Sequence, residues 1–152
     1  METPHTHARG RLPDLTLMLL RMVTGAFLVH GAQDNVFSPE RMQEFVAFLT
    51  QHGFAWPHLM APLSVYAQFL CGILLVLGRL VRWAGLEVAI NFVVAVMMVH
   101  WHQDFRGWWP ALVLVLLGLH FAAQGGGRYA LDSVLAARRR GRRAAGAGRP
   151  AG

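Results

Sequence analysis

Besides Arg82 near the start of one stretch, seven charged, amide or histidine side chains stand inside stretches of this sequence that are otherwise almost entirely apolar. An ionised group at the centre of a lipid bilayer costs about 2.5–3.5 kcal/mol on insertion scales, so such groups usually face a helix-bundle interior and have partners. These side chains are therefore the strongest candidates for a functional site. The seven are Arg21, His30, Gln68, Glu87, Asn91, His100 and His120.

Four of these residues form a candidate quinone or proton site. His30 and His100 each end an apolar stretch, and two facing imidazoles can hydrogen-bond a quinone carbonyl or exchange protons near neutral pH. Asn91 follows Glu87 by one helical turn, and Gln68 lies at a similar depth, so the three can form a polar ladder. Two alternatives stay open. The histidines can simply bond loop backbone, and the amides can serve only to join helices.

Metal binding is not predicted from the outer histidines. His100 and His102 are separated by two positions, so on a helix they point about 200° apart. A metal site needs three or four converging ligands, and the sequence has no ligand-spacing motif. We therefore predict no metal.

Arg21 and Glu87 form a candidate buried ion pair. Each lies six residues from the same end of its apolar stretch, which places both roughly 9 Å inside the membrane at 1.5 Å per residue. The alternative is that Arg21 extends alone to the lipid headgroups.

Four apolar stretches must position these side chains. A helix needs about 20 residues to cross a bilayer, and each stretch approaches that length. Hydrophobic residues make up 55% of the 152 positions and charged residues only 14%, which leaves no room for a separate soluble domain. We therefore predict an all-α fold, a transmembrane four-helix bundle. The stretches are approximately Leu15–His30, Pro62–Gly78, Val81–His100 and Trp108–Ala123.

The first outer loop, residues 31–61, contains a short amphipathic helix by its pattern. Ser38 can cap the N-terminus of the helix, and Pro39 suits its first turn. The negative charge of Glu40 interacts favourably with the positive N-terminal end of the helix dipole. This helix is either a plain cover or a lid over a lipid-accessible pocket. Its apolar face consists of Met42, Phe45, Val46, Phe48 and Leu49.

The charge distribution predicts the orientation. All 14 basic residues are arginines, and eleven of them lie before the first stretch, between the second and third, or after the fourth. The positive-inside rule then places both termini in the cytoplasm, and a basic tail beside a membrane argues for contact with anionic lipid rather than nucleic acid. The predicted regions are a cytoplasmic segment 1–14, a four-helix domain 15–132 and a disordered Arg-rich cytoplasmic tail 133–152. Cys71 is the single cysteine, which excludes dithiol chemistry within the chain.

Four segments in order resemble the DoxX family of small bacterial membrane proteins. They are LLRMVTGAFLVHGAQD, YAQFLCGILLVLGRLVRWAGL, AINFVVAVMMVHW and GGGRYALD, and the likeness covers about residues 15–135. Two positions depart from the family pattern, which often has Glu in place of Gln68 and Lys in place of Asp34. Glu87 can replace the missing carboxylate one helix over. The resemblance implies a four-helix bundle in the bacterial inner membrane and an association with quinone-linked oxidation, including subunits similar to thiosulfate:quinone oxidoreductase.

The resulting hypothesis is an accessory or quinone-binding subunit of a membrane oxidoreductase system. No haem, flavin or cysteine-pair motif occurs in the chain, so a quinone is the one cofactor considered and a redox partner protein must supply electrons. The alternative is a non-catalytic membrane factor that stabilises or positions a partner protein. A small transporter is disfavoured, because no internal repeat is evident. Substrate and oligomeric state are left open.

Overall fold

The computed structural model describes residues 11–101 and 103–147, without the side chains of 139 and 141–147, and its described part contains helices and no strand. The elements are α1 (Arg11–Phe37), α2 (Pro39–Gln51), α3 (Pro57–Leu77), α4 (Val81–Ala95), the π-helix η1 (Val96–His100), α5 (Phe105–Gln124) and α6 (Leu131–Ala147). Four helices, with η1 continuing α4, are long and apolar enough to cross a membrane. The predicted all-α transmembrane bundle is confirmed, and each span includes or nearly includes its apolar stretch.

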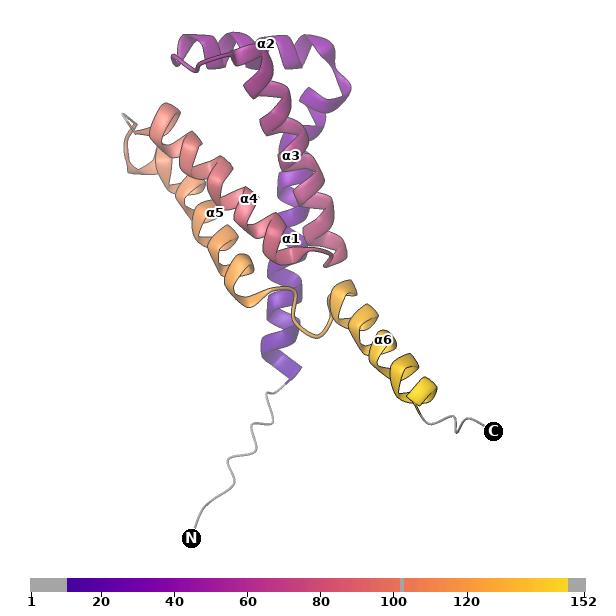
Figure 1. Ribbon diagram of the computed structural model, residues 1–152. Helices are drawn as coiled ribbons and strands as arrows, with labels where there is room; N and C mark the ends of the chain where they lie inside the picture. The colour runs from indigo at the N-terminus through magenta and orange to yellow at the C-terminus, as the bar shows by residue number, and fades with distance from the viewer. Residues whose placement is uncertain (1–10, 102, 148–152) are drawn as a thin grey trace.

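The spans associate as two helix pairs. α1 packs along α3, α4 packs along α5, and the narrower contact between α3 and α4 joins the pairs. Figure 1 shows the pairs close together at the end that carries the α3–α4 turn and diverging toward the end that carries α2. These are called the turn end and the α2 end below. Their divergence creates space between α3 and α4 near the α2 end.

Both pairs are held by glycines at the point where the helix backbones meet. A Cβ built on Gly25 of α1 would lie 2.5 Å from the carbonyl oxygen of Gly72 on α3. A Cβ built on Gly85 of α4 would lie 2.6 Å from the carbonyl oxygen of Gly118 on α5. Lipid tails are as apolar as the side chains, so close backbone packing is a main source of helix association in membranes.

The buried core lies mainly toward the turn end. Phe121 and Leu75 are fully buried there, whereas Val23, Leu70 and Leu116 are each more than half exposed on the spans. Such exposure is unsuited to water and suits a protein whose outer surface contacts lipid tails.

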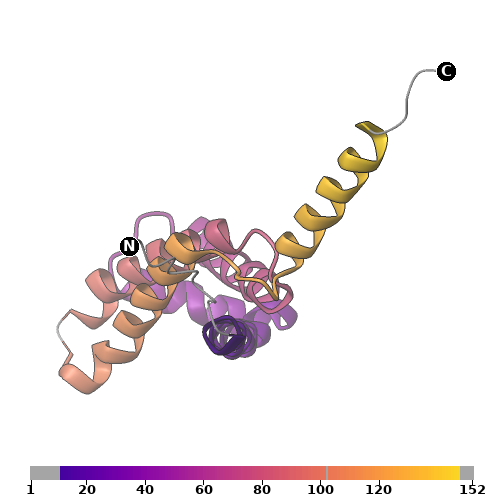
Figure 2. The ribbon, with the colours of Figure 1, turned by 90° about the horizontal axis from the view of Figure 1, so that it is seen from below.

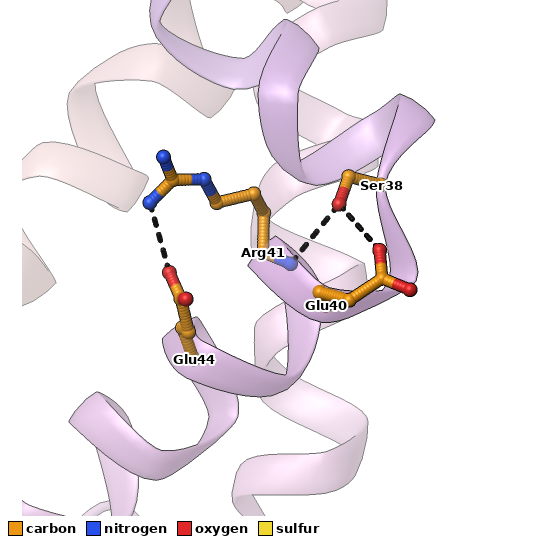
Figure 3. A network of polar contacts seen from close by, with 4 residues as sticks. All are labelled: Ser38, Glu40, Arg41 and Glu44. Carbon is orange, nitrogen blue, oxygen red and sulfur yellow. Dashed lines mark hydrogen bonds and ion pairs between the residues drawn. The ribbon is translucent and has the colours of Figure 1, made fainter.

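α2 confirms the amphipathic helix predicted in the first outer loop. The Ser38 hydroxyl accepts a hydrogen bond from the Arg41 backbone N–H at 3.3 Å and donates one to Glu40 at 2.8 Å. Arg41 and Glu44 form an exposed ion pair at 3.0 Å (Figure 3). Hydrogen bonds from its own backbone and from Ser38 lower the pKa of the Glu40 carboxyl. Figure 1 shows α2 lying across the ends of α1 and α3.

The prediction of disorder after residue 132 is wrong over residues 133–147, which belong to α6. Alanine and arginine are among the strongest helix formers, and Asp132 in the first turn favours the helix dipole, so this composition forms a helix without a buried core. Both views show α6 directed away from the four spans (Figures 1 and 2). The predicted N-terminal segment falls mostly outside the described residues, as does the end of the tail from residue 148.

Candidate functional site

A groove of about 680 Å³ lies where α3 and α4 diverge beneath α2. Phe45 and Phe48 from α2, Leu63 from α3, and Leu86 and Ile90 from α4 contribute to its largely apolar wall. This volume is within the usual range for small-molecule sites, about 300–1,000 Å³, and such sites combine apolar walls with a few polar groups. We call it the α3–α4 groove. Its α2 residues come from the predicted apolar face, so α2 both covers the bundle and forms one wall of a pocket.

The structure brings three of the four predicted site residues to this groove. Gln68, Asn91 and His100 all line it, together with Glu87. His30 does not belong to the lining. It is exposed on α1, where the Gln33 side chain bonds its Nδ1 atom at 2.9 Å. The expected facing of His30 and His100 is therefore absent, because α1 packs against α3 while His100 belongs to the other helix pair.

A hydrogen bond that sequence reasoning missed joins α3 to α4 within the groove. The Ser64 hydroxyl donates to Asn91 Oδ1 at 2.8 Å. Because that oxygen is occupied, the Asn91 amide nitrogen is left as the donor available at the groove wall. The spacing contains the signal that would have found Ser64, since Ser64 and Gln68 are one turn apart, as are Glu87 and Asn91.

Gln68 connects the groove to the other helix pair. Its Nε2 atom donates to the backbone carbonyl of Leu28 on α1 at 3.3 Å. The amide thus helps to hold α3 on α1, the helix-joining alternative considered for this residue, while its side chain still lines the groove.

His100 lies at the α2 end of the groove, in the π-helical turn η1. Its Nδ1 atom is 2.8 Å from Gln103 Oε1, an acceptor, so we assign the ring proton to Nδ1 and leave Nε2 free to accept. The π-helical turn ends the third span, and His100 is its last residue.

The predicted Arg21–Glu87 ion pair is wrong. Both side chains are described, no ion pair joins them, and Arg21 Nε, Arg21 Nη1 and Glu87 Oε2 are buried without hydrogen-bond partners. Glu87 lies beside Cys71 of α3. Equal depth placed the two charges at one level, but α1 and α4 belong to different helix pairs, and α3 lies between them.

Arg21 instead reaches the α3–α4 turn. The side chain is 1% exposed, its guanidinium occupies the open face of Gly78, and its electrostatic partner is Asp132 at the start of α6. Asp132 in turn accepts the Leu80 backbone N–H at 2.6 Å. Arg21 therefore connects α1 with the turn end and has no contact with the groove, a role that the sequence interval to Glu87 did not indicate.

Removing the Glu87 charge is expected to leave the protein equally or more stable. A buried carboxylate without a cation costs free energy in a bilayer, so Glu87→Gln should raise the free energy of unfolding by up to about 3 kcal/mol. Thermal unfolding in detergent measures this change. Gln43→Glu on α2 is the control, because it exchanges the same two residue types at an exposed position. A clear fall in melting temperature for Glu87→Gln would contradict the expectation.

No cluster of three or more His, Cys, Asp or Glu side chains suitable for a metal occurs within the described part of the chain. His102, one of the outer histidines considered above, lies outside the described residues.

A comparison with protein families matches residues 16–101 to the family model described as DoxX. The match begins in α1 and ends just after η1, so it contains every residue of the α3–α4 groove. Searches of curated proteins and of solved structures found no match. Because the family match covers more than half of the sequence, this multi-pass membrane protein belongs to the DoxX family.

Proposed function

We propose that this DoxX protein is a quinone-binding accessory subunit of a membrane oxidoreductase system. The observation that carries the proposal is the α3–α4 groove, which combines mainly apolar walls with Gln68, Glu87, Asn91 and His100 in one lining. A quinone has the matching chemistry, since its ring and tail are apolar and its two carbonyl oxygens accept hydrogen bonds.

The groove residues supply different contacts to such a ring. The Asn91 amide nitrogen can donate to one carbonyl, because Ser64 occupies the Asn91 oxygen. His100 Nε2 can accept a hydroxyl proton, or donate to a carbonyl when the ring is protonated. A bound quinone supplies two-electron, two-proton redox chemistry, with electrons drawn from a partner protein.

Glu87 is the proposed proton-holding group of the groove. Its Oε2 atom is buried without a partner, so no other residue of the described chain competes for a proton at that oxygen. A lone ionisable group inside a membrane span is a functional candidate by default, because its cost must be offset by a use or a partner.

The proposed location is the bacterial inner membrane, with both termini in the cytoplasm. Arg79 in the α3–α4 turn and Arg82 at the start of α4 lie at the same end as Arg128 and Arg138, which follow α5. This grouping agrees with the positive-inside rule. Reporter fusions at each terminus and at α2 test the orientation.

Quinone binding by the purified full chain tests the function. We expect saturable binding of ubiquinone or menaquinone, and a loss of about tenfold in affinity for Asn91→Ala or His100→Ala, as for the loss of one hydrogen bond of about 1.4 kcal/mol. His30→Ala is the matched control, because it removes an outer histidine that does not line the groove. Absence of saturable binding, or equal loss in the control, would contradict the proposal.

The alternative function is a non-catalytic factor that stabilises or positions a partner membrane protein. The divergence of the two helix pairs favours it, because an apolar partner helix can enter the same space. Stable co-purification of a partner together with absent quinone binding would support this function over the first.

A further inference from the structure

A second, larger pocket lies at the turn end, and its lining shares one residue, Trp83, with that of the α3–α4 groove. It measures about 940 Å³ and lies between the start of α4, the glycine linker 125–127 and the first turns of α6. Three arginines line it: Arg82 of α4, Arg128 directly after the linker and Arg138 of α6.

The pocket has a surplus of positive charge. Among the described residues, none of its three arginines forms an ion pair. Two carboxylates share the lining, but Asp14 accepts the Arg128 backbone N–H at 3.3 Å, and Asp132 accepts the Leu80 backbone N–H at 2.6 Å. Asp132 also acts electrostatically on buried Arg21. The carboxylates are therefore engaged by the fold, while the guanidinium groups remain available.

Arg82 of α4 packs directly against the glycine linker. Gly125, Gly126 and Gly127 carry no side chains, and the Arg82 side chain lies over Gly125, with its Nε atom 3.2 Å from where a Cβ would stand. Guanidinium groups form paired hydrogen bonds with phosphate oxygens, which makes arginine the usual residue for recognising phosphate.

The position of the pocket relative to the membrane indicates which kind of phosphate-containing molecule can reach it. The pocket lies at the ends of two spans, α4 and α5, and Trp83 in its lining is 71% exposed. Tryptophan at the end of a span lies at headgroup level. We propose that this pocket binds the phosphate group of an anionic membrane lipid. The proposal does not depend on quinone binding, because none of the three arginines lines the α3–α4 groove.

Lipid-dependent thermal stability of the delipidated full chain tests this assignment. Phosphatidylglycerol should raise the melting temperature more than phosphatidylcholine at the same concentration, with half-saturation at a lower concentration. Arg82→Gln and Arg128→Gln should each weaken the phosphatidylglycerol effect about fivefold, the loss expected for one arginine near an anionic surface. Arg79→Gln is the matched control, because it removes the same charge from the same end outside the pocket.

A second variant keeps the test valid if an arginine substitution prevents folding. Ala137→Glu places a negative charge in the pocket lining on α6, beside Arg138, and removes no arginine. It should also weaken the phosphatidylglycerol effect. Equal loss in Arg79→Gln, or no preference for phosphatidylglycerol over phosphatidylcholine, would overturn the proposal. Equal stabilisation by inorganic phosphate would overturn the lipid assignment, and so would saturation by an acidic peptide instead of lipid.

Discussion

Gly25→Ala is expected to weaken the α1–α3 pair by about 1–3 kcal/mol, the usual cost of overpacking a tight contact. The added Cβ would lie 2.5 Å from the Gly72 carbonyl oxygen and 3.0 Å from the Val76 backbone nitrogen. Backbone atoms cannot change rotamer to avoid the clash as a side chain can. α1 must therefore move away from α3, and close contacts along the pair are lost. Unfolding of the purified protein in a detergent series measures the loss.

Gly31→Ala is the matched control on the same helix. A Cβ at Gly31 would meet only the Gln68 side chain, at an ordinary distance of 3.6 Å. Alanine is a better helix former than glycine, so this substitution should leave stability unchanged or raise it. Equal losses at Gly25 and Gly31 would show that the close approach of α1 and α3 does not hold the pair together.

Gly78→Ala is expected to destabilise the protein by about 3 kcal/mol, for two separate reasons. Gly78 ends α3 with a φ of +74°, a left-handed conformation that costs a residue with a Cβ roughly 1–2 kcal/mol. Its open face is also filled, because a Cβ would overlap the Arg21 guanidinium and lie 2.8 Å from the Ala130 Cα atom. Thermal unfolding in detergent is again the measurement.

Gly53→Ala separates the two contributions to this loss. Gly53 has nearly the same φ, +73°, and nothing lies within 4 Å of a Cβ built there. Its substitution should therefore show the conformational cost alone, roughly 1–2 kcal/mol. If Gly78→Ala cost no more than Gly53→Ala, the packing of Arg21 against the α3–α4 turn would contribute nothing to stability.

The two large effects arise at two different contacts of α1. The α1–α3 pair depends on the Gly25–Gly72 crossing, whereas Gly78 and Arg21 tie α1 to the turn that joins the pairs. The α3–α4 groove lies between the two helices that this turn connects. Gly78→Ala should therefore also alter ligand binding in the groove, because the angle between α3 and α4 starts at this turn.

Local features of the chain determined the membrane spans and the amphipathic helix. Hydropathy over about 20 residues depends on composition alone, and the Ser38 cap depends on neighbours within three positions. These properties require no knowledge of which helices meet. The prediction of disorder over α6 rested on the absence of residues that could form a core. Alanine and arginine nevertheless favour a helix locally, and this preference needs no packing partner.

The tertiary structure determines which of the predicted site residues come together. Asn91 and Gln68 meet the groove as their depth indicated, but depth along a span does not specify which way a helix faces or which helix lies beside it. For this reason Arg21 and Glu87 lie at equal depth and form no ion pair. For the same reason His30 and His100 bond different residues, Gln33 and Gln103. The sequence by itself determined the helices and their order, because those depend on neighbouring residues. Only the tertiary structure decided which side chains face one another, because close backbone contacts such as Gly25–Gly72 and Gly85–Gly118 set the pairing and rotation of the spans.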